Sequence, residues 1–130
     1  MTMGAPIPAD PPLTAESQPF YDAAREGRFL LRRCGGCGKT HWYPRAVCPH
    51  CFGETAWEEA SGRGRIYSYS VMRRADPVYC IAYVTLDEGP TMLTNIVGAD
   101  FDAIAVGQEV EVAWTPSKSG IPVPCFKPRG

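Results

Sequence analysis

Two CxxC pairs, CGGC at residues 34–37 and CPHC at residues 48–51, are the part of this 130-residue chain best suited to chemistry. Each pair can turn two thiolates toward one point, and two pairs supply the tetrahedral sulfur set that holds Zn²⁺ at about 2.3 Å. Ten residues separate the pairs. Common zinc sites have roughly 15–20 residues there, but the paired spacing still predicts a metal site. Four thiolates leave no open coordination position, so we expect one structural zinc ion. The predicted ligands are Cys34, Cys37, Cys48 and Cys51.

Two other interpretations of these residues are weaker. A redox-active dithiol needs only one CxxC pair, whereas two pairs at this spacing favour metal. His50 lies inside the second pair and could replace a thiolate, but four cysteines already complete the set. Residues 1–12 lack the charged and apolar regions of a signal peptide, so we expect a cytoplasmic protein with reduced cysteines. No apolar run is long enough to span a membrane.

The sequence contains no convincing catalytic combination of residues. It has no GxSxG, HExxH, Walker or Rossmann pattern. Cys80 and Cys125 have no adjacent His that could activate a thiol, so we expect small buried side chains. Asp87 and Glu88 precede a Gly-Pro pair and are expected in a turn. We therefore expect no catalytic residues in this chain.

Charge is distributed unevenly along the chain, although the net charge is only −1. Residues 28–65 sum to +4, whereas residues 75–115 hold seven acidic residues and no Lys or Arg. Proteins that bind duplex DNA usually carry a clear basic excess, because affinity comes from neutralising phosphates. The basic segment here is better suited to a few phosphate groups than to a polymer.

Apolar periodicity predicts a mainly β protein with one short helix. The helix is expected within residues 15–27, followed by a short strand at 29–31 and a returning strand at 55–59. Further strands are expected at 65–72, 79–86, 91–97, 109–114 and 121–126, with a helical turn at 100–105. Five such strands fit a five-stranded Greek-key barrel of the OB type. We expect a flexible arm (1–14), a helix with its lead-in strand (15–33), a zinc ribbon (34–60) with a hinge after it, and an OB-fold (61–130).

The sequence resembles a bacterial and archaeal family, formerly of unknown function, that combines an N-terminal helix, a rubredoxin-like four-Cys zinc ribbon and an OB-fold. The resemblance covers roughly residues 15–128 and leaves the four cysteines intact. It is carried by FYDAAREGRFLL at 20–31, the two CxxC pairs with YPR at 43–45, SGRGRIYSYSVM at 61–72, AYVTLDEGPTMLTNIVG at 82–98, VGQEVEV at 106–112 and PCFKP at 124–128.

This resemblance implies a non-catalytic accessory subunit of a thiolase-superfamily enzyme, such as a thiolase, an acyl-CoA aldolase or a related synthase. A thiolase-fold partner would hold the catalytic residues, and acyl-CoA would bind at or near the interface. Arginines can pair with the CoA phosphates while an aromatic side chain supports the adenine. The candidate CoA or partner contacts are Arg32, Arg33, Trp42, Tyr43, Arg45, Arg63 and Arg65. In the alternative interpretation, Trp42 and Tyr43 cover the small core of the ribbon, and most of the arginines are solvated.

Two other functions stay open at this point. Tyr67 and Tyr69 could stack on single-stranded nucleic acid, as aromatic residues of OB-folds do, although the acidic segment at 75–115 counts against it. The chain could also be an interaction module whose partner is unrelated to CoA.

Overall fold

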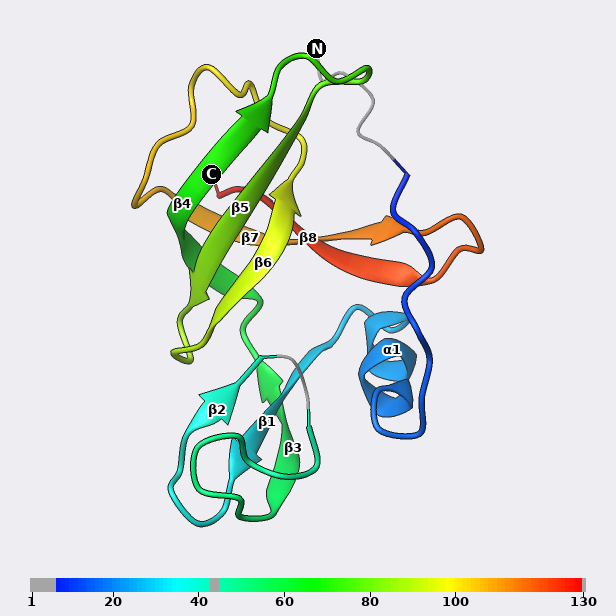
Figure 1. Cartoon of the computed structure of the whole chain (residues 1–130), viewed down its shortest axis with the longest axis vertical. Helices are drawn as coiled ribbons and strands as arrows, with labels where there is room; N and C mark the ends of the chain where they lie inside the picture. The colour runs from blue at the N-terminus through cyan, green and yellow to red at the C-terminus, as the bar shows by residue number, and fades with distance from the viewer. Residues whose placement is uncertain (1–6, 43–44, 130) are drawn as a thin grey trace.

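The computed structural model describes residues 7–42 and 45–129. It confirms a mainly β protein with one short helix, a four-Cys cluster and a closed five-stranded barrel (Figure 1). In chain order the elements are α1 (Gln18–Ala24), β1 (Phe29–Cys34), β2 (Thr40–His41), β3 (Thr55–Ala60), β4 (Arg63–Met72), β5 (Tyr79–Leu86), β6 (Thr91–Ile96), β7 (Glu109–Pro116) and β8 (Pro122–Pro128).

The ribbon is built on a three-stranded antiparallel sheet in the order β2-β1-β3. β1 and β3 pair along their whole length, from Phe29 opposite Ala60 to Cys34 opposite Thr55. β1 therefore delivers the first cysteine at the end of the sheet that lies farthest from the barrel (Figure 1). The two-residue strand β2 was not predicted, because two residues are too short to show a period.

The barrel closes in the order β4-β5-β6-β8-β7. β4 pairs with β5 along its length and with β7 through residues 63–65. The pairing of β4 with β7 joins the first and last strands of the sheet and closes the barrel. A register shift after Ile66 marks a bulge, the usual device for bending a strand at a barrel corner. The Pro-rich strand β8 closes the barrel by pairing with β7 and, in parallel, with β6. Residues 101–103 form turns rather than the predicted helical turn, while Ile104 is buried.

Helix, ribbon and barrel share one aromatic core. The ring of Phe29 at the start of β1 lies 5.7 Å from Phe20 of α1, 5.7 Å from Trp114 of β7 and 6.3 Å from Phe126 of β8, measured between ring centres. Trp42, after β2, lies 5.1 Å from the ring of Phe20. Rings at these separations bury large areas and add favourable edge contacts. The ribbon is therefore packed on the barrel through its first strand.

The segment between ribbon and barrel, expected as a hinge, is held on both sides. The backbone N–H of Ser61 donates to Oε2 of Glu88 at 2.9 Å, and the carbonyl of Gly62 accepts from the N–H of Val112 at 2.7 Å. Gly62 has a φ of +74°, which favours glycine. A Cβ on Gly64 would lie 2.6 Å from the carbonyl oxygen of Thr85, so β4 approaches β5 as closely as only glycine permits.

The described part of the N-terminal segment contacts the turn between β7 and β8. The carboxylate of Asp10 accepts hydrogen bonds from the hydroxyls of Ser117 and Ser119, both at 2.6 Å, and from the N–H of Ser119 at 2.9 Å. These bonds lower the pKa of Asp10. Within residues 7–42 and 45–129, no helix has the length and apolar character of a membrane span.

Candidate metal centre and its surroundings

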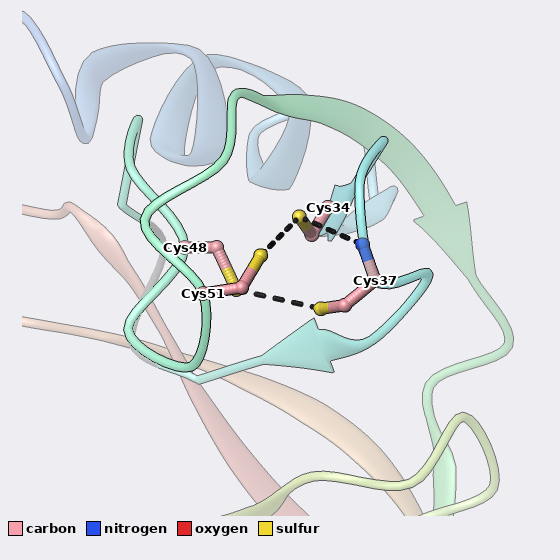
Figure 2. Close-up of side chains that lie close together, drawn as sticks. All are labelled: Cys34, Cys37, Cys48 and Cys51. Atoms are coloured by element: carbon pink, nitrogen blue, oxygen red, sulfur yellow. Dashed lines mark hydrogen bonds between the residues drawn. The ribbon is translucent and has the colours of Figure 1, made fainter.

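The structure brings the four predicted ligands together at the tip of the ribbon (Figure 2). Their sulfur atoms all lie within 4.8 Å of one another. The Cys34 and Cys51 sulfurs are 3.4 Å apart, and those of Cys37 and Cys48 are 3.7 Å apart. Tetrahedral Zn–S bonds of about 2.3 Å imply sulfur separations of about 3.8 Å. The donor set thus has the atoms and the spacing of a four-thiolate zinc site.

Both CxxC turns are built by the same backbone hydrogen bonds. In the first, the N–H of Gly38 donates to the carbonyl of Cys34, and the N–H of Cys34 donates to the carbonyl of Lys39, each at 2.9 Å. In the second, the N–H of Phe52 donates to the carbonyl of Cys48, and the N–H of Cys48 donates to the carbonyl of Gly53, again at 2.9 Å. Both turns pass through a positive φ, at +74° for Gly38 and +64° for Phe52.

Backbone amides surround the buried sulfurs. The N–H groups of Gly36 and Cys37 lie 3.2 Å and 3.4 Å from the Cys34 sulfur, and the N–H of His50 lies 3.3 Å from the Cys48 sulfur. The N–H of Cys37 is the largest contribution that lowers the pKa of the Cys34 thiol, which falls to about 6. These amides favour the thiolate of Cys34, which is the form that binds metal.

The four sulfurs cannot all ionise without a compensating charge. The N–H of Gly53 lowers the pKa of Cys51, but the neighbouring sulfurs of Cys34, Cys37 and Cys48 together with burial raise it to about 11. A bound divalent cation supplies the missing positive charge and deprotonates a coordinating thiol. The residues present therefore fit Zn²⁺, and its ligands would be Cys34, Cys37, Cys48 and Cys51.

The candidate CoA contacts on β1 are engaged in the ribbon. Arg32 donates through Nη1 to the carbonyl of Thr55 at 2.9 Å, and its guanidinium lies 4.2 Å from the centre of the Trp57 ring, a cation–π contact. Arg33 forms an ion pair with Glu58 at 2.9 Å, with the Arg33 side chain 42% exposed. These contacts give both arginines a part in joining β1 to β3.

The remaining candidates are divided between ribbon and barrel. Trp42 is half-buried against Phe20, and it lines a cleft together with Arg33. Arg45 is exposed, and Tyr43 lies outside the described residues. Arg63 and Arg65 are exposed on β4, where Arg65 forms an ion pair with Glu109 at 2.9 Å. The described candidates therefore do not gather in one place, and the packing of Trp42 fits its interpretation as a core residue.

A cleft of about 600 Å³ separates the ribbon from the turn between β5 and β6. The hydroxyl of Thr40 donates across it to the carbonyl of Glu88 at 2.9 Å. The Nε2 atom of buried His41 accepts from the N–H of Arg45 at 3.1 Å, which places the proton of the neutral ring on Nδ1. Within the described residues, neither this Nδ1 nor Oε1 of Glu88 has a partner.

Sequence reasoning did not find this cleft. It placed Glu88 only in a turn and gave no role to Lys39, which also lines the cleft. The two walls are separated by almost fifty residues, and no local pattern indicates that they meet. Cys80 and Cys125 are buried as expected, and burial raises the pKa of both thiols, which makes them poor nucleophiles.

Two family models match the chain. Residues 22–58 match the rubredoxin-like zinc ribbon domain of ChsH2, and residues 57–115 match its C-terminal OB-fold domain. A DUF35 domain-containing scaffold protein of Methanothermobacter thermautotrophicus is 37% identical over 90 residues, which cover 63% of this chain and 68% of that protein.

A longer relative contains the same unit. A probable enoyl-CoA hydratase alpha subunit of Thermomonospora curvata is 32% identical over 125 residues, which cover 91% of this chain. The chain spans only 39% of the length of that protein.

Solved structures agree with these matches. A chain of the Ltp2-ChsH2(DUF35) aldolase superimposes with a TM-score of 0.77 at 30% identity, over 92% of this chain and 98% of the other. A DUF35 protein of unknown function from Sulfolobus solfataricus shares the fold, with a TM-score of 0.67 at 17% identity. The chain therefore belongs to the ChsH2/DUF35 family, in which a rubredoxin-like zinc ribbon is joined to a C-terminal OB-fold domain.

Proposed function

We propose that this chain binds one structural Zn²⁺ ion and acts as a non-catalytic accessory subunit of a thiolase-superfamily enzyme that works on acyl-CoA. The observation that carries the proposal is the likeness to the aldolase chain. Almost all of this chain superimposes on 98% of a chain of the Ltp2-ChsH2(DUF35) aldolase at 30% identity.

The zinc part of the proposal rests on the cluster at the ribbon tip. Four thiols lie within 4.8 Å of one another, and the chain matches a rubredoxin-like zinc ribbon. Structural sites use four protein ligands, whereas catalytic ones keep a position for water or substrate. Bound zinc would fix the two CxxC turns and would contribute directly to the free energy of folding of the ribbon.

The accessory part rests on the chemistry of the described residues. The two cysteines outside the cluster are buried, with raised thiol pKa values. His41 is buried, and burial lowers its pKa, so the ring is neutral at physiological pH. One ring nitrogen is committed to a backbone N–H. This arrangement lacks the nucleophile and base pair that acyl transfer requires, so the reacting groups would come from a thiolase-fold partner.

The acyl-CoA part rests on the cleft between the ribbon and the β5–β6 turn. Arg33, Lys39 and His50 lie along its ribbon side, where basic groups can pair with phosphate oxygens. The cleft measures about 600 Å³ and lies between the ribbon and the β5–β6 turn, so it would hold part of a CoA molecule rather than enclose the whole. A partner subunit would supply the rest of the binding surface.

Co-purification tests the proposal. The tagged chain is isolated from the extract of its native cells, with an unrelated tagged OB-fold protein as the control, and retained proteins are identified by mass spectrometry. We expect a thiolase-fold protein in near-equal amount with the tagged chain and absent from the control. Zinc content, measured on the same sample, is expected to be one ion per chain.

Reconstitution then separates an accessory subunit from an enzyme. The purified chain alone is expected to show no thiolysis or aldol cleavage of acyl-CoA substrates, whereas the partner is expected to be more active with the chain than without it. Turnover by the isolated chain would contradict the accessory role. Recovery of single-stranded nucleic acid in place of a protein partner would favour the nucleic-acid function instead.

A further inference from the structure

Phe52, at the ribbon tip, is unusual for phenylalanine in two ways: it is exposed to solvent, and its backbone is in the left-handed conformation. The residue is 81% exposed, although phenylalanine is among the more often buried residue types. Its φ is +64°, the left-handed conformation that disfavours residues with a Cβ. Asn and Asp tolerate this conformation through their short polar side chains, but Phe has no such compensation.

The first CxxC turn provides an internal comparison. Gly38 occupies the position there that Phe52 occupies in the second turn, with a φ of +74°. Each residue donates its N–H to the carbonyl of the first cysteine of its turn at 2.9 Å. The turn therefore forms with glycine at this position and makes no use of a side chain. The aromatic ring of Phe52 is an addition that costs backbone strain and serves something other than the fold of the ribbon.

The surroundings of Phe52 form a small apolar projection with a polar rim. Val47 is 53% exposed and is joined by a β-bridge to Glu54 on the far side of the turn. A hollow of about 470 Å³ beside Phe52 is lined by Glu16, Arg45, Val47, Cys48, Pro49 and Phe52. An aromatic anchor surrounded by charged groups of both signs is the composition of a protein–protein contact. Membrane and nucleic-acid surfaces call for an excess of basic residues, which this rim lacks.

The projection is held in place by hydrogen bonds within the chain. The N–H of Cys48 donates to the carbonyl of Gly53 at 2.9 Å, and the N–H of Thr55 donates to the carbonyl of Ala46 at 3.2 Å. Glu16 accepts the N–H of Ala46 at 2.9 Å, which ties the loop to the segment before α1. A preorganised anchor loses little conformational entropy on binding, so more of its buried area contributes to affinity.

We propose that Phe52, with Val47 beside it, is the anchor by which this chain binds an apolar pocket on the thiolase-fold subunit. This inference rests on the proposed function, because it assigns the contact surface of that assembly. Phe52 fills the pocket, and Arg45 and Glu54 lie at the rim, where they exclude water and fix the orientation.

The test compares variants of the full chain for affinity to the thiolase-fold subunit recovered by co-purification and purified separately. Phe52→Gly and Phe52→Asn both accommodate a positive φ and both remove the aromatic ring. The matched control is Leu93→Ala, which truncates a side chain of the barrel that is 56% exposed. Dissociation constants are measured by calorimetry, together with zinc content and the melting temperature of each variant.

We expect both Phe52 variants to weaken binding by about 30-fold or more, as loss of an interface anchor does. Zinc content should equal that of the wild type, and the melting temperature should be equal or higher because the backbone strain is relieved. Leu93→Ala should bind within about threefold of the wild type. This combination separates an anchor from a residue that supports the fold.

Binding of both Phe52 variants within threefold of the wild type would overturn the inference and leave the proposed function standing. A change in self-association of the chain alone, measured by sedimentation with unchanged partner affinity, would also overturn it by placing Phe52 between copies of this chain. If the wild type binds no thiolase-fold subunit, the proposed function fails and this inference fails with it.

Discussion

A Cβ atom on Gly53 would lie 3.0 Å from the sulfur of Cys34 and 3.3 Å from that of Cys51. The backbone just after the second CxxC turn therefore packs directly on the cluster, and a methyl group at Gly53 would fit only if the sulfurs moved by a few tenths of an ångström. We expect Gly53→Ala to lower zinc affinity at least tenfold, because the sulfurs must move apart to admit the methyl. Competition with a chromophoric chelator measures the affinity.

Gly35→Ala is the control for that variant, since Gly35 lies in the other CxxC turn and its Cβ would meet only the carbonyl oxygen of Glu54, at an ordinary 3.8 Å. We expect this variant to bind zinc as the wild type does. If Gly53→Ala and the wild type bind zinc with equal affinity, the packing of Gly53 against the sulfurs is looser than the structure indicates.

Removal of a buried ligand should release the metal and unfold the ribbon. Cys34→Ser and Cys48→Ser each replace a thiolate by a weakly binding hydroxyl, and structural zinc contributes on the order of 10 kcal/mol to such small units. We expect less than one tenth of a zinc ion per chain by atomic emission and a large loss of melting temperature. Cys80→Ala, which shortens a buried cysteine of the barrel, should keep one zinc ion. Retained zinc in both serine variants would contradict the four-ligand assignment.

The pH dependence of stability should contain a contribution from His41. Burial lowers the pKa of its imidazole below the ordinary value of about 6.5, so the unfolded chain binds a proton more readily than the folded one. Stability from His41 is then complete above about pH 6.5 and is lost as the pH falls toward the folded-state pKa. We expect His41→Gln, which cannot titrate, to lose less stability than the wild type between pH 7.5 and 5.5.

That comparison is made by denaturant unfolding with zinc in excess, because protonation of the cluster contributes at acid pH in both proteins. The quantity that matters is the difference between the two proteins at each pH. A difference that does not change with pH would show that His41 titrates alike in the folded and unfolded chain.

Gly64 should contribute strongly to the stability of the barrel, because it lets β4 approach β5 closely. A methyl group there would lie 2.6 Å from the carbonyl oxygen of Thr85, in a pair of strands that cannot separate without breaking their hydrogen bonds. We expect Gly64→Ala to lower the free energy of unfolding by about 3 kcal/mol, as overpacking does. Gly120→Ala, in the open β7–β8 turn with a φ of +85°, should cost about 1–2 kcal/mol from backbone strain alone. Urea midpoints compare the two variants, and a smaller loss for Gly64→Ala would contradict the close approach.

The metal cluster and most strands could be predicted from the sequence because their signals are local. Spacing alone identifies Cys34 and Cys51 as members of one site, and alternating or continuous β-rich runs identify most strands of the barrel. The cleft could not be predicted, since Thr40 and Glu88 meet only when ribbon and barrel pack together. The role proposed for Phe52 could not be predicted either, because it rests on a backbone angle that this residue type disfavours.

The predicted boundaries between the arm, the helix with its lead-in strand, the ribbon and the OB-fold stay predictions. The structure adds contacts that cross those boundaries. Asp10 bonds to the β7–β8 turn, and the hydroxyl of Thr40 in the ribbon donates to the carbonyl of Glu88 in the barrel. Neither contact has a sequence signal, because each joins a short polar side chain to a distant loop.

The strand β1 carries Phe29 of the shared aromatic core at one end and the metal ligand Cys34 at the other. Excision of the ribbon would therefore expose the rings of Trp114 and Phe126, and excision of the barrel would leave Phe29 without its neighbours. We therefore expect the helix, ribbon and barrel to occur together in related proteins, as one folding unit. The match of 91% of this chain to one part of the longer Thermomonospora curvata protein agrees with this expectation.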